Sequence, residues 1–326
     1  MRNGLNRLCA ALLAGIFLLG AGGALSEAES SGWQFDERGF LTGENIGDEY
    51  LLEDPEEGVW KYSTENLSIR ITRYTETKTV KKVKKTLEYC VAEVYASEAS
   101  PLFTIATPAS KRKVAGYYKV KPEKLVKDNP VMLAVSDDYY GHRLQTKDNG
   151  SAKWPGGIII RNGELLSEKT RNSTMKRYLP PLDTLAVYGD GSMKTFLCDE
   201  LTPEEYLEQG AQQVFAFGPW LIRDGEINEK EAGEGSDYYA YNDPRAAIGM
   251  IEPWHYILLV VKGEPKNKYT GVHLDWVAQK MKELGCVEAL NLDGGGTACM
   301  VFNGKTIIQG RSAARAMGSM IAFGSK

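Results

Sequence analysis

The spacing of apolar residues along the chain predicts many short strands joined by tight turns. Polar–apolar alternation over residues 66–97 indicates two strands that form a hairpin. A short apolar run at 131–135 ends abruptly in polar residues and predicts another strand. Further strand pairs surround Asn-Gly and Asp-Gly turns, a Glu-Pro step and a run of glycines; these segments are 156–166, 184–196, 213–227, 245–264 and 287–305.

Two predicted helices interrupt the strands. The first, over 201–211, has Thr202 as its N-cap, Pro203 in its first turn and Gly210 as its stop. The second, over 273–285, carries its apolar residues on one face and ends at Gly285. Because the helices are inserted among strands and do not alternate with them, the pattern predicts an α+β fold. We expect mixed or antiparallel sheets, a few inserted helices and a single main domain.

The N-terminus has the features of a secretory signal peptide. Arg2 and Arg7 precede an apolar run over 8–19, and small residues follow it. The sequence therefore predicts a signal peptide over 1–26 and a secreted or cell-envelope protein. An uncleaved membrane anchor is the alternative, although the run is short and broken by glycine. No later stretch is long and apolar enough to cross a membrane.

We expect the mature chain to comprise a β-rich extension over 27–87 and a main domain over 88–326. With 43% hydrophobic residues, the chain can bury a substantial core. The formal net charge of −4 becomes −6 without Arg2 and Arg7, which argues against nucleic acid as the main partner. The lysine-rich run at 78–85 is interpreted as the solvated face of a strand, with a polyanion-binding patch as the alternative.

Cysteine spacing and missing motifs exclude several classes of site. The four cysteines of the mature chain are far apart and lack the spacing of a zinc site. Cys90 and Cys299 lie in apolar runs and are expected to be buried, while oxidation of a cysteine pair stays open. The sequence contains no nucleophile elbow, no Walker pattern and no dinucleotide-binding glycine motif. Its three isolated histidines disfavour a histidine-rich two-metal phosphoesterase.

The most informative polar residue is Asp293, which ends an apolar strand and is followed by Gly294, Gly295 and Gly296. A tight turn needs one glycine, so three indicate that the backbone approaches another group closely. Exposed amides of such a loop can bind an anion, and an adjacent acid can act in acid–base or nucleophilic catalysis. Simple turn chemistry is the alternative. A carboxylate beside such a loop could also hold a divalent cation, and the sequence does not identify a metal.

Several motifs, in order, resemble the phosphodiester glycosidase family. They are SDDYYGHR, GGIIIRNG, YGDGSM, QVFAFGPWLIRDGEI, DPRAAIG, HYILLVV, KELGC and ALNLDGGG, and the resemblance covers roughly residues 88–326. It implies hydrolysis of a sugar 1-phosphodiester, of the N-acetylglucosamine-1-phosphodiester type, at the glycosidic carbon–oxygen bond. Bacterial members are labelled exopolysaccharide-biosynthesis proteins, so the implied substrates are cell-surface or extracellular glycans.

The same resemblance implies a set of site residues. Asp293 and Asp138 would be catalytic acids, and Arg245 would hold the phosphate. The implied substrate-binding residues are Gly294, Gly295, Gly296, Asn291, Thr297, Arg143, Glu252 and His255. Which acid acts as nucleophile or proton donor stays open, and Arg245 as a structural ion-pair partner is the alternative.

Some departures from the family pattern fall close to this site. DGGGTACM stands where the family has DGGGSSTM, so Thr297 keeps a hydroxyl but Ala298 and Cys299 do not. The closing R-x-x-S-D pattern ends here in Ser319 and lacks its carboxylate, whereas Asp137 stands where many members have glycine. These losses support a second hypothesis, a catalytically degenerate member that binds envelope glycans or aids exopolysaccharide assembly.

Overall fold

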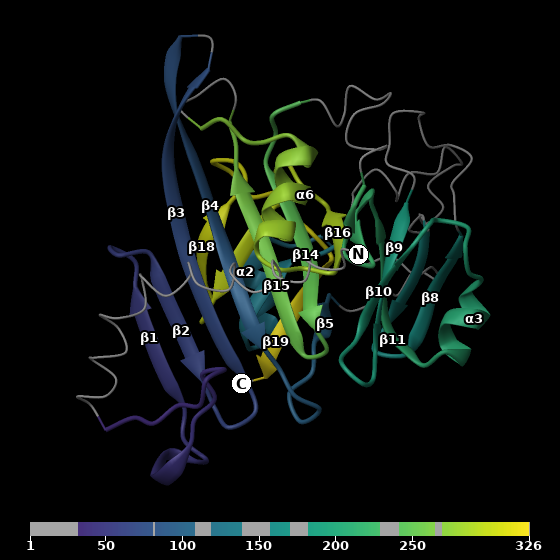
Figure 1. Cartoon of the computed structure of the whole chain (residues 1–326), viewed down its shortest axis with the longest axis horizontal. Helices are drawn as coiled ribbons and strands as arrows, with labels where there is room; N and C mark the ends of the chain where they lie inside the picture. The colour runs from purple at the N-terminus through teal and green to yellow at the C-terminus, as the bar shows by residue number, and fades with distance from the viewer. Residues whose placement is uncertain are drawn as a thin grey trace, which may run out of the picture.

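The computed structural model describes residues 32–80, 82–107, 119–138, 157–169, 182–228, 241–264 and 269–325, and it contains three antiparallel sheets (Figure 1). The largest is a nine-stranded sheet in the order β1-β2-β3-β4-β15-β14-β16-β12-β13. Its strands are β1 (Tyr50–Asp54), β2 (Val59–Ser63), β3 (Ser68–Val80), β4 (Val83–Tyr95), β15 (His255–Lys262), β14 (Arg245–Glu252), β16 (Glu288–Leu292), β12 (Trp220–Arg223) and β13 (Glu226–Ile227).

Two five-stranded sheets pack beside it. One has the order β10-β9-β11-β7-β8 and is built from β10 (Met193–Phe196), β9 (Asp183–Tyr188), β11 (Ala211–Phe217), β7 (Gly157–Arg161) and β8 (Glu164–Lys169). The other has the order β18-β17-β6-β19-β5 and is built from β18 (Lys305–Gln309), β17 (Cys299–Phe302), β6 (Val131–Ser136), β19 (Ser319–Ser325) and β5 (Phe103–Ala106).

Among the described residues, three α-helices pack on the sheets. Helix α6 (Leu274–Glu283) buries Leu274, Val277 and Met281 against one face of the nine-stranded sheet. Helix α3 (Pro203–Glu208) packs Tyr206 against β7 and β11, and its first turn is closed by a capping box between Thr202 and Glu205. Helix α2 (Pro122–Asp128) packs on the third sheet, and a short 3-10 turn, η1, spans Gly43–Asn45.

One hydrophobic core joins the three sheets. It combines Trp60 from β2, Leu292 from β16, Phe215 from β11 and Phe302 from β17, all of which are buried. The predicted α+β class, with antiparallel sheets and few helices, is confirmed. Within the described residues, no helix combines the length and the apolar character needed to span a bilayer.

The expected boundary between the extension and the main domain falls inside β4. Strand β3 pairs with β4 along its whole length, from Ser68 opposite Tyr95 to Val80 opposite Val83. Strands β1 and β2 then continue the same sheet. Residues 50–87 therefore extend the main sheet and contribute Trp60 and Tyr62 to the common core. The predicted signal peptide lies outside the described residues.

Candidate functional site

The glycine-rich loop connects the nine-stranded sheet to the third sheet. It leaves β16 at Asp293 and enters β17 at Cys299. The Asp293 side chain is 3% exposed, and its backbone N–H donates to the Asp137 carbonyl at 3.0 Å. Because β14 pairs Ala246 with Leu292, the next residues, Arg245 and Asp293, meet at one edge of the sheet.

The glycines are explained by close packing against the chain itself. A Cβ on Gly294 would lie 2.6 Å from the Pro244 carbonyl oxygen. Gly295 has a φ of +63° and donates its N–H to the same oxygen at 2.9 Å. A Cβ on Gly310 would lie 2.2 Å from the Gly295 oxygen. The loop is therefore held rigidly between the Asp243–Arg245 segment and Gly310.

Two guanidinium groups flank this loop. Arg245 is buried, and it donates from Nε to the Val272 carbonyl at 3.2 Å and from Nη2 to the Tyr241 carbonyl at 2.8 Å. Arg315 is exposed and lies over Gly296, where a Cβ would be 3.6 Å from its Nε. Within the described part of the chain, no acid pairs with Arg315. Arg245 is thus fixed in place by carbonyls, whereas Arg315 can turn toward a ligand.

Asn291 presents an unused acceptor beside the loop. Its Nδ2 donates to the Gly218 carbonyl at 2.8 Å, which fixes the orientation of the amide. The opposite atom, Oδ1, is buried and has no hydrogen-bond partner among the described residues. A buried acceptor without a donor is costly, so this position suits a ligand hydroxyl. Thr297 differs, because its Oγ1 donates to the Gly294 carbonyl at 2.5 Å and closes the loop internally.

Asp138 belongs to a buried ionic cluster with Asp137, Arg161 and Ser319. One Asp138 oxygen bonds to Arg161 Nη2, and the other accepts from the Ala216 N–H at 2.6 Å. Asp137 Oδ2 accepts from Ser319 Oγ and lies 3.9 Å from Arg161 Nη2. The cluster touches the glycine loop through the Asp137 carbonyl, which accepts from Asp293. Asp138 is therefore placed to hold β7 and β11 together beneath the loop.

The cluster changes the significance of two departures from the family pattern. Strand β6 pairs Ser136 with Met320 of β19, so Asp137 and Ser319 meet just beyond these strand ends. Asp137, which follows the neighbouring strand β6, places its carboxylate against Ser319, where the closing motif lacks one. Ala298 and Cys299, in turn, are both 0% exposed and pack in hydrophobic clusters. Burial raises the pKa of the Cys299 thiol.

Glu252 and His255 do not lie with the other candidates. Arg245 begins β14 and Glu252 ends it, and seven residue steps of a strand span roughly 24 Å. His255 faces Glu252 across the turn and bonds through Nε2 to Glu93 at 3.1 Å. That hydrogen bond holds the pKa of Glu93 below its ordinary value. The predicted placement of Glu252 and His255 at the site was wrong, and Arg143 lies outside the described residues.

Metal ligands are not gathered in the described part of the molecule. No group of three or more His, Cys, Asp or Glu side chains is arranged there to hold an ion. Asp137 and Asp138 face Arg161, which competes for their negative charge. The described residues that meet at the site are Asp293, Arg245, Asn291, Thr297 and the three glycines, with Asp137 and Asp138 beneath them.

Sequence reasoning gave Arg161 and Arg315 no role in the site, and it noted Ser319 only as a departure from the closing motif. Arg161 stands in the GGIIIRNG motif and Arg315 opens the closing motif, so both stood next to recognised patterns. Their roles depend on contacts between residues far apart in the chain. Ser319, for example, is 182 positions from Asp137.

A glycine loop headed by an acid, with two guanidinium groups beside it, agrees with the family that the sequence motifs resemble. The sequence profile of that family, phosphodiester glycosidase, matches residues 129–324, and the chain belongs to the family. Among curated relatives, the uncharacterised prophage-derived protein YomE of Bacillus subtilis is 29% identical over 227 residues, which is 66% of this chain and 33% of YomE. The bovine N-acetylglucosamine-1-phosphodiester alpha-N-acetylglucosaminidase is 34% identical over 123 residues, which is 34% of this chain and 23% of that enzyme.

The fold is shared with a solved relative. The catalytic domain of the zebrafish N-acetylglucosamine-1-phosphodiester alpha-N-acetylglucosaminidase superposes with a TM-score of 0.60 and 20% identity, over 79% of this chain and 84% of that domain. This chain matches only about a third or less of the length of the curated relatives described above.

Proposed function

We propose that the protein is a secreted glycosidase that hydrolyses a sugar 1-phosphodiester of cell-surface or extracellular glycans. The observation that carries the proposal is the position of Asp293, at the head of a rigid glycine loop and next to Arg245. Family membership supports hydrolase chemistry on a glycosidic bond. The named relatives support N-acetylglucosamine as the sugar of the substrate.

The phosphate would be held by the loop and its two arginines. Among the described residues, the backbone amides of Gly294 and Gly296 have no hydrogen-bond acceptor. These amides, with Arg315, would provide charge-assisted hydrogen bonds for a phosphate oxygen, and Arg245 would add its positive charge beside them. They would stabilise the negative charge that develops on the departing phosphate.

Asp293 would act at the sugar carbon. Cleavage of a glycosidic bond passes through an oxocarbenium-like transition state, which a nearby carboxylate stabilises. A phosphate monoester leaves readily as an anion, so proton donation matters less here than when an alcohol departs. We assign Asp293 the catalytic carboxylate, Asn291 Oδ1 a sugar hydroxyl, and Asp138 a positioning role beneath the loop.

The hypothesis of a degenerate, binding-only member loses part of its support. Ala298 and Cys299 are packed in the core, so hydroxyls at these positions would point into apolar surroundings. Asp137 offers a carboxylate to Ser319 at the place where the closing motif lacks one. Retained catalysis therefore agrees better with the arrangement of these residues than loss of activity does.

Sugar release tests the proposal. The full chain and an Asp293→Asn variant would be incubated with an N-acetylglucosamine-1-phosphodiester, and free sugar would be measured. We expect release by the wild type and a loss of at least roughly 100-fold in the variant. Equal release by both proteins would remove Asp293 from the mechanism. Binding without release by either protein would favour the degenerate member.

A further inference from the structure

A cavity lies away from Asp293, near the other end of strand β9. Its volume is about 400 Å³, within the range of about 300–1,000 Å³ typical of small-molecule sites. Strand β9 runs from Asp183, which accepts from the Trp220 N–H near Asn291, to Tyr188 at the cavity. The five residue steps between them span roughly 17 Å. The two sites are therefore separate.

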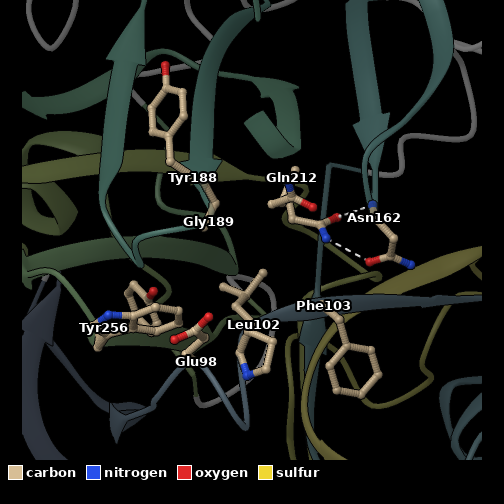
Figure 2. A pocket seen from close by; sticks show the side chains of 12 residues that line it. Glu98, Leu102, Phe103, Asn162, Tyr188, Gly189, Gln212 and Tyr256 are labelled. Atoms are coloured by element: carbon tan, nitrogen blue, oxygen red, sulfur yellow. Dashed lines mark hydrogen bonds between the residues drawn. The ribbon is translucent and has the colours of Figure 1, made fainter. Parts of the chain in front are cut away.

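The cavity lies where the three sheets meet. Figure 2 shows Glu98, Leu102 and Tyr256 on one side of it, and Gly189 and Gln212 on the other. Glu98 and Leu102 come from the β4–β5 connection, Gly189 follows β9, and Tyr256 belongs to β15. Each sheet thus contributes to the walls.

Trp254 lines this cavity in an unusual backbone conformation. Its φ is +69°, a value that bulky side chains rarely adopt. Two hydrogen bonds hold it there, from its N–H to the Gly191 carbonyl at 3.1 Å and from the Ala96 N–H to its own carbonyl at 2.8 Å. The indole covers Gly191, where a Cβ would lie 2.2 Å from the ring. A strained backbone conformation of this kind persists only where the surrounding structure holds it, and such positions cluster at ligand sites.

The polar side chains that line the cavity with Trp254 are neutral amides, the tyrosines Tyr188 and Tyr256, and one acid. Asn162 Oδ1 accepts from Gln213 Nε2 at 2.7 Å, and Gln213 Oε1 accepts from Thr104 Oγ1 at 2.8 Å, so this wall is rigid. Gln212 is exposed, and no described residue donates to its Oε1. The Glu98 carboxylate is exposed and makes no ion pair or hydrogen bond with the described residues.

We infer that this cavity binds a neutral saccharide, with Trp254 as the surface on which a sugar ring lies. An aromatic face suits the apolar face of a sugar, and free amide and carboxylate oxygens accept from its hydroxyls. The described lining residues include no Lys, Arg or His, so a phosphate group has no cationic partner there. The site would hold a sugar of the glycan away from the cleaved bond. The choice of sugar probe and the link to the cleaved glycan rest on the proposed function, whereas saccharide binding itself does not.

Calorimetric titration of the full chain with the β-1,4-linked trimer of N-acetylglucosamine tests the inference. We expect binding that weakens roughly tenfold or more in Trp254→Gly, Gln212→Ala and Glu98→Ala. Glycine at 254 retains the positive φ, and the other two variants change exposed side chains only. Asp293→Asn and Glu226→Ala, which lie outside the cavity, should bind as the wild type does. Sugar release from a small soluble phosphodiester should be unchanged in the three cavity variants.

Three results would overturn the inference. The first is the absence of any heat of binding with the trimer at concentrations up to about 10 mM. The second is binding that all three cavity variants leave unchanged. The third is binding of choline in preference to the trimer, since Trp254 and Glu98 would then form a site for a cation. None of these results depends on whether Asp293 is catalytic, so the two proposals fail separately.

Discussion

At the scale of single residues, the glycine loop rests on a buried ionic cluster whose members lie far apart in the sequence. Asp137 contacts Ser319 through its side chain and Asp293 through its carbonyl, and it lies near Arg161. Removing one member of a buried ion pair leaves the other charge uncompensated. The position of the glycine loop is thus linked to the charge balance beneath it.

Exchange of Asp137 and Ser319 tests this link. Asp137→Ser should destabilise the fold by about 3 kcal/mol, because among the described acids Arg161 then retains only Asp138 as a buried partner. Ser319→Asp should also destabilise it by placing a second carboxylate beside Asp137. The double variant restores one carboxylate and one hydroxyl, so urea unfolding should show most of the stability recovered. Additive losses in the double variant would show that the two positions do not cooperate.

Gly294 should not tolerate a side chain. In Gly294→Ala the new methyl would meet the Pro244 carbonyl oxygen at 2.6 Å, and the loop must shift. We expect a loss of about 1–3 kcal/mol in the free energy of unfolding and a lower kcat. Gly189→Ala is the matched control, because nothing lies within 4 Å of that position. Comparable losses in the two variants would contradict the packing account.

These residues show how far the sequence predicts the site. Asp293, its glycines and Arg245 were predicted because adjacent residues and family motifs mark them. The contacts of Arg161 and Ser319 with Asp138 and Asp137 were not predicted, because they join distant segments. Glu252 and His255 were misplaced, since a strand pattern does not say which end of a strand meets the loop. The cavity where the three sheets meet was not predicted, because its walls come from all of them.

At the scale of elements, alternation and turn residues predicted most strands and two helices. The helix predicted over 201–211 is α3, and the one predicted over 273–285 is α6. Helix α2 was missed, because seven residues with few apolar positions give no clear helical period. The hairpin predicted over 66–97 forms β3 and β4, which pair with β2 and β15 at the end near Tyr95.

The hydrogen bond between Glu93 of β4 and His255 of β15 should make the free energy of unfolding depend on pH. His255 bonds to Glu93 and lowers the pKa of Glu93 below its ordinary value of 4.5. The stabilisation by the carboxylate is therefore complete above that ordinary pKa and is lost as the pH falls through the lowered pKa. Glu93→Gln should reduce stability by about 0.5–1 kcal/mol at pH 7, and the difference should vanish in acid.

Urea unfolding at several pH values measures this difference. Glu226→Gln serves as the control, because Glu226 is exposed and lies outside the pair. A deficit in Glu93→Gln that grows as the pH falls would have the opposite sign and would contradict the assignment.

At the scale of the whole molecule, the three sheets share one core, and the N-terminal strands belong to it. Trp60 of β2 is 3% exposed, lies in the same cluster as Leu292 and Phe302, and is covered by the Arg73 guanidinium. Strand β16, which leads into the glycine loop, is therefore supported by residues that the sequence assigned to an extension.

Trp60→Ala should destabilise the whole molecule by about 3–5 kcal/mol, because it leaves a cavity in the shared core. Leu51→Ala on β1 is the control, since Leu51 is 43% exposed and should cost less than about 0.5 kcal/mol. A single unfolding transition is expected in both variants. Separate melting of the N-terminal strands in Trp60→Ala would show that they form an independent unit.

The central claim is that Asp293 and the glycine loop direct cleavage to the sugar carbon and not to phosphorus. Hydrolysis of an N-acetylglucosamine-1-phosphodiester in water enriched in the heavy oxygen isotope tests this directly by mass spectrometry. We expect the isotope to enter the C1 hydroxyl of the released sugar and the phosphate product to stay unlabelled. Label in the phosphate product would contradict the account, because the bond between phosphorus and oxygen would then be the one that breaks.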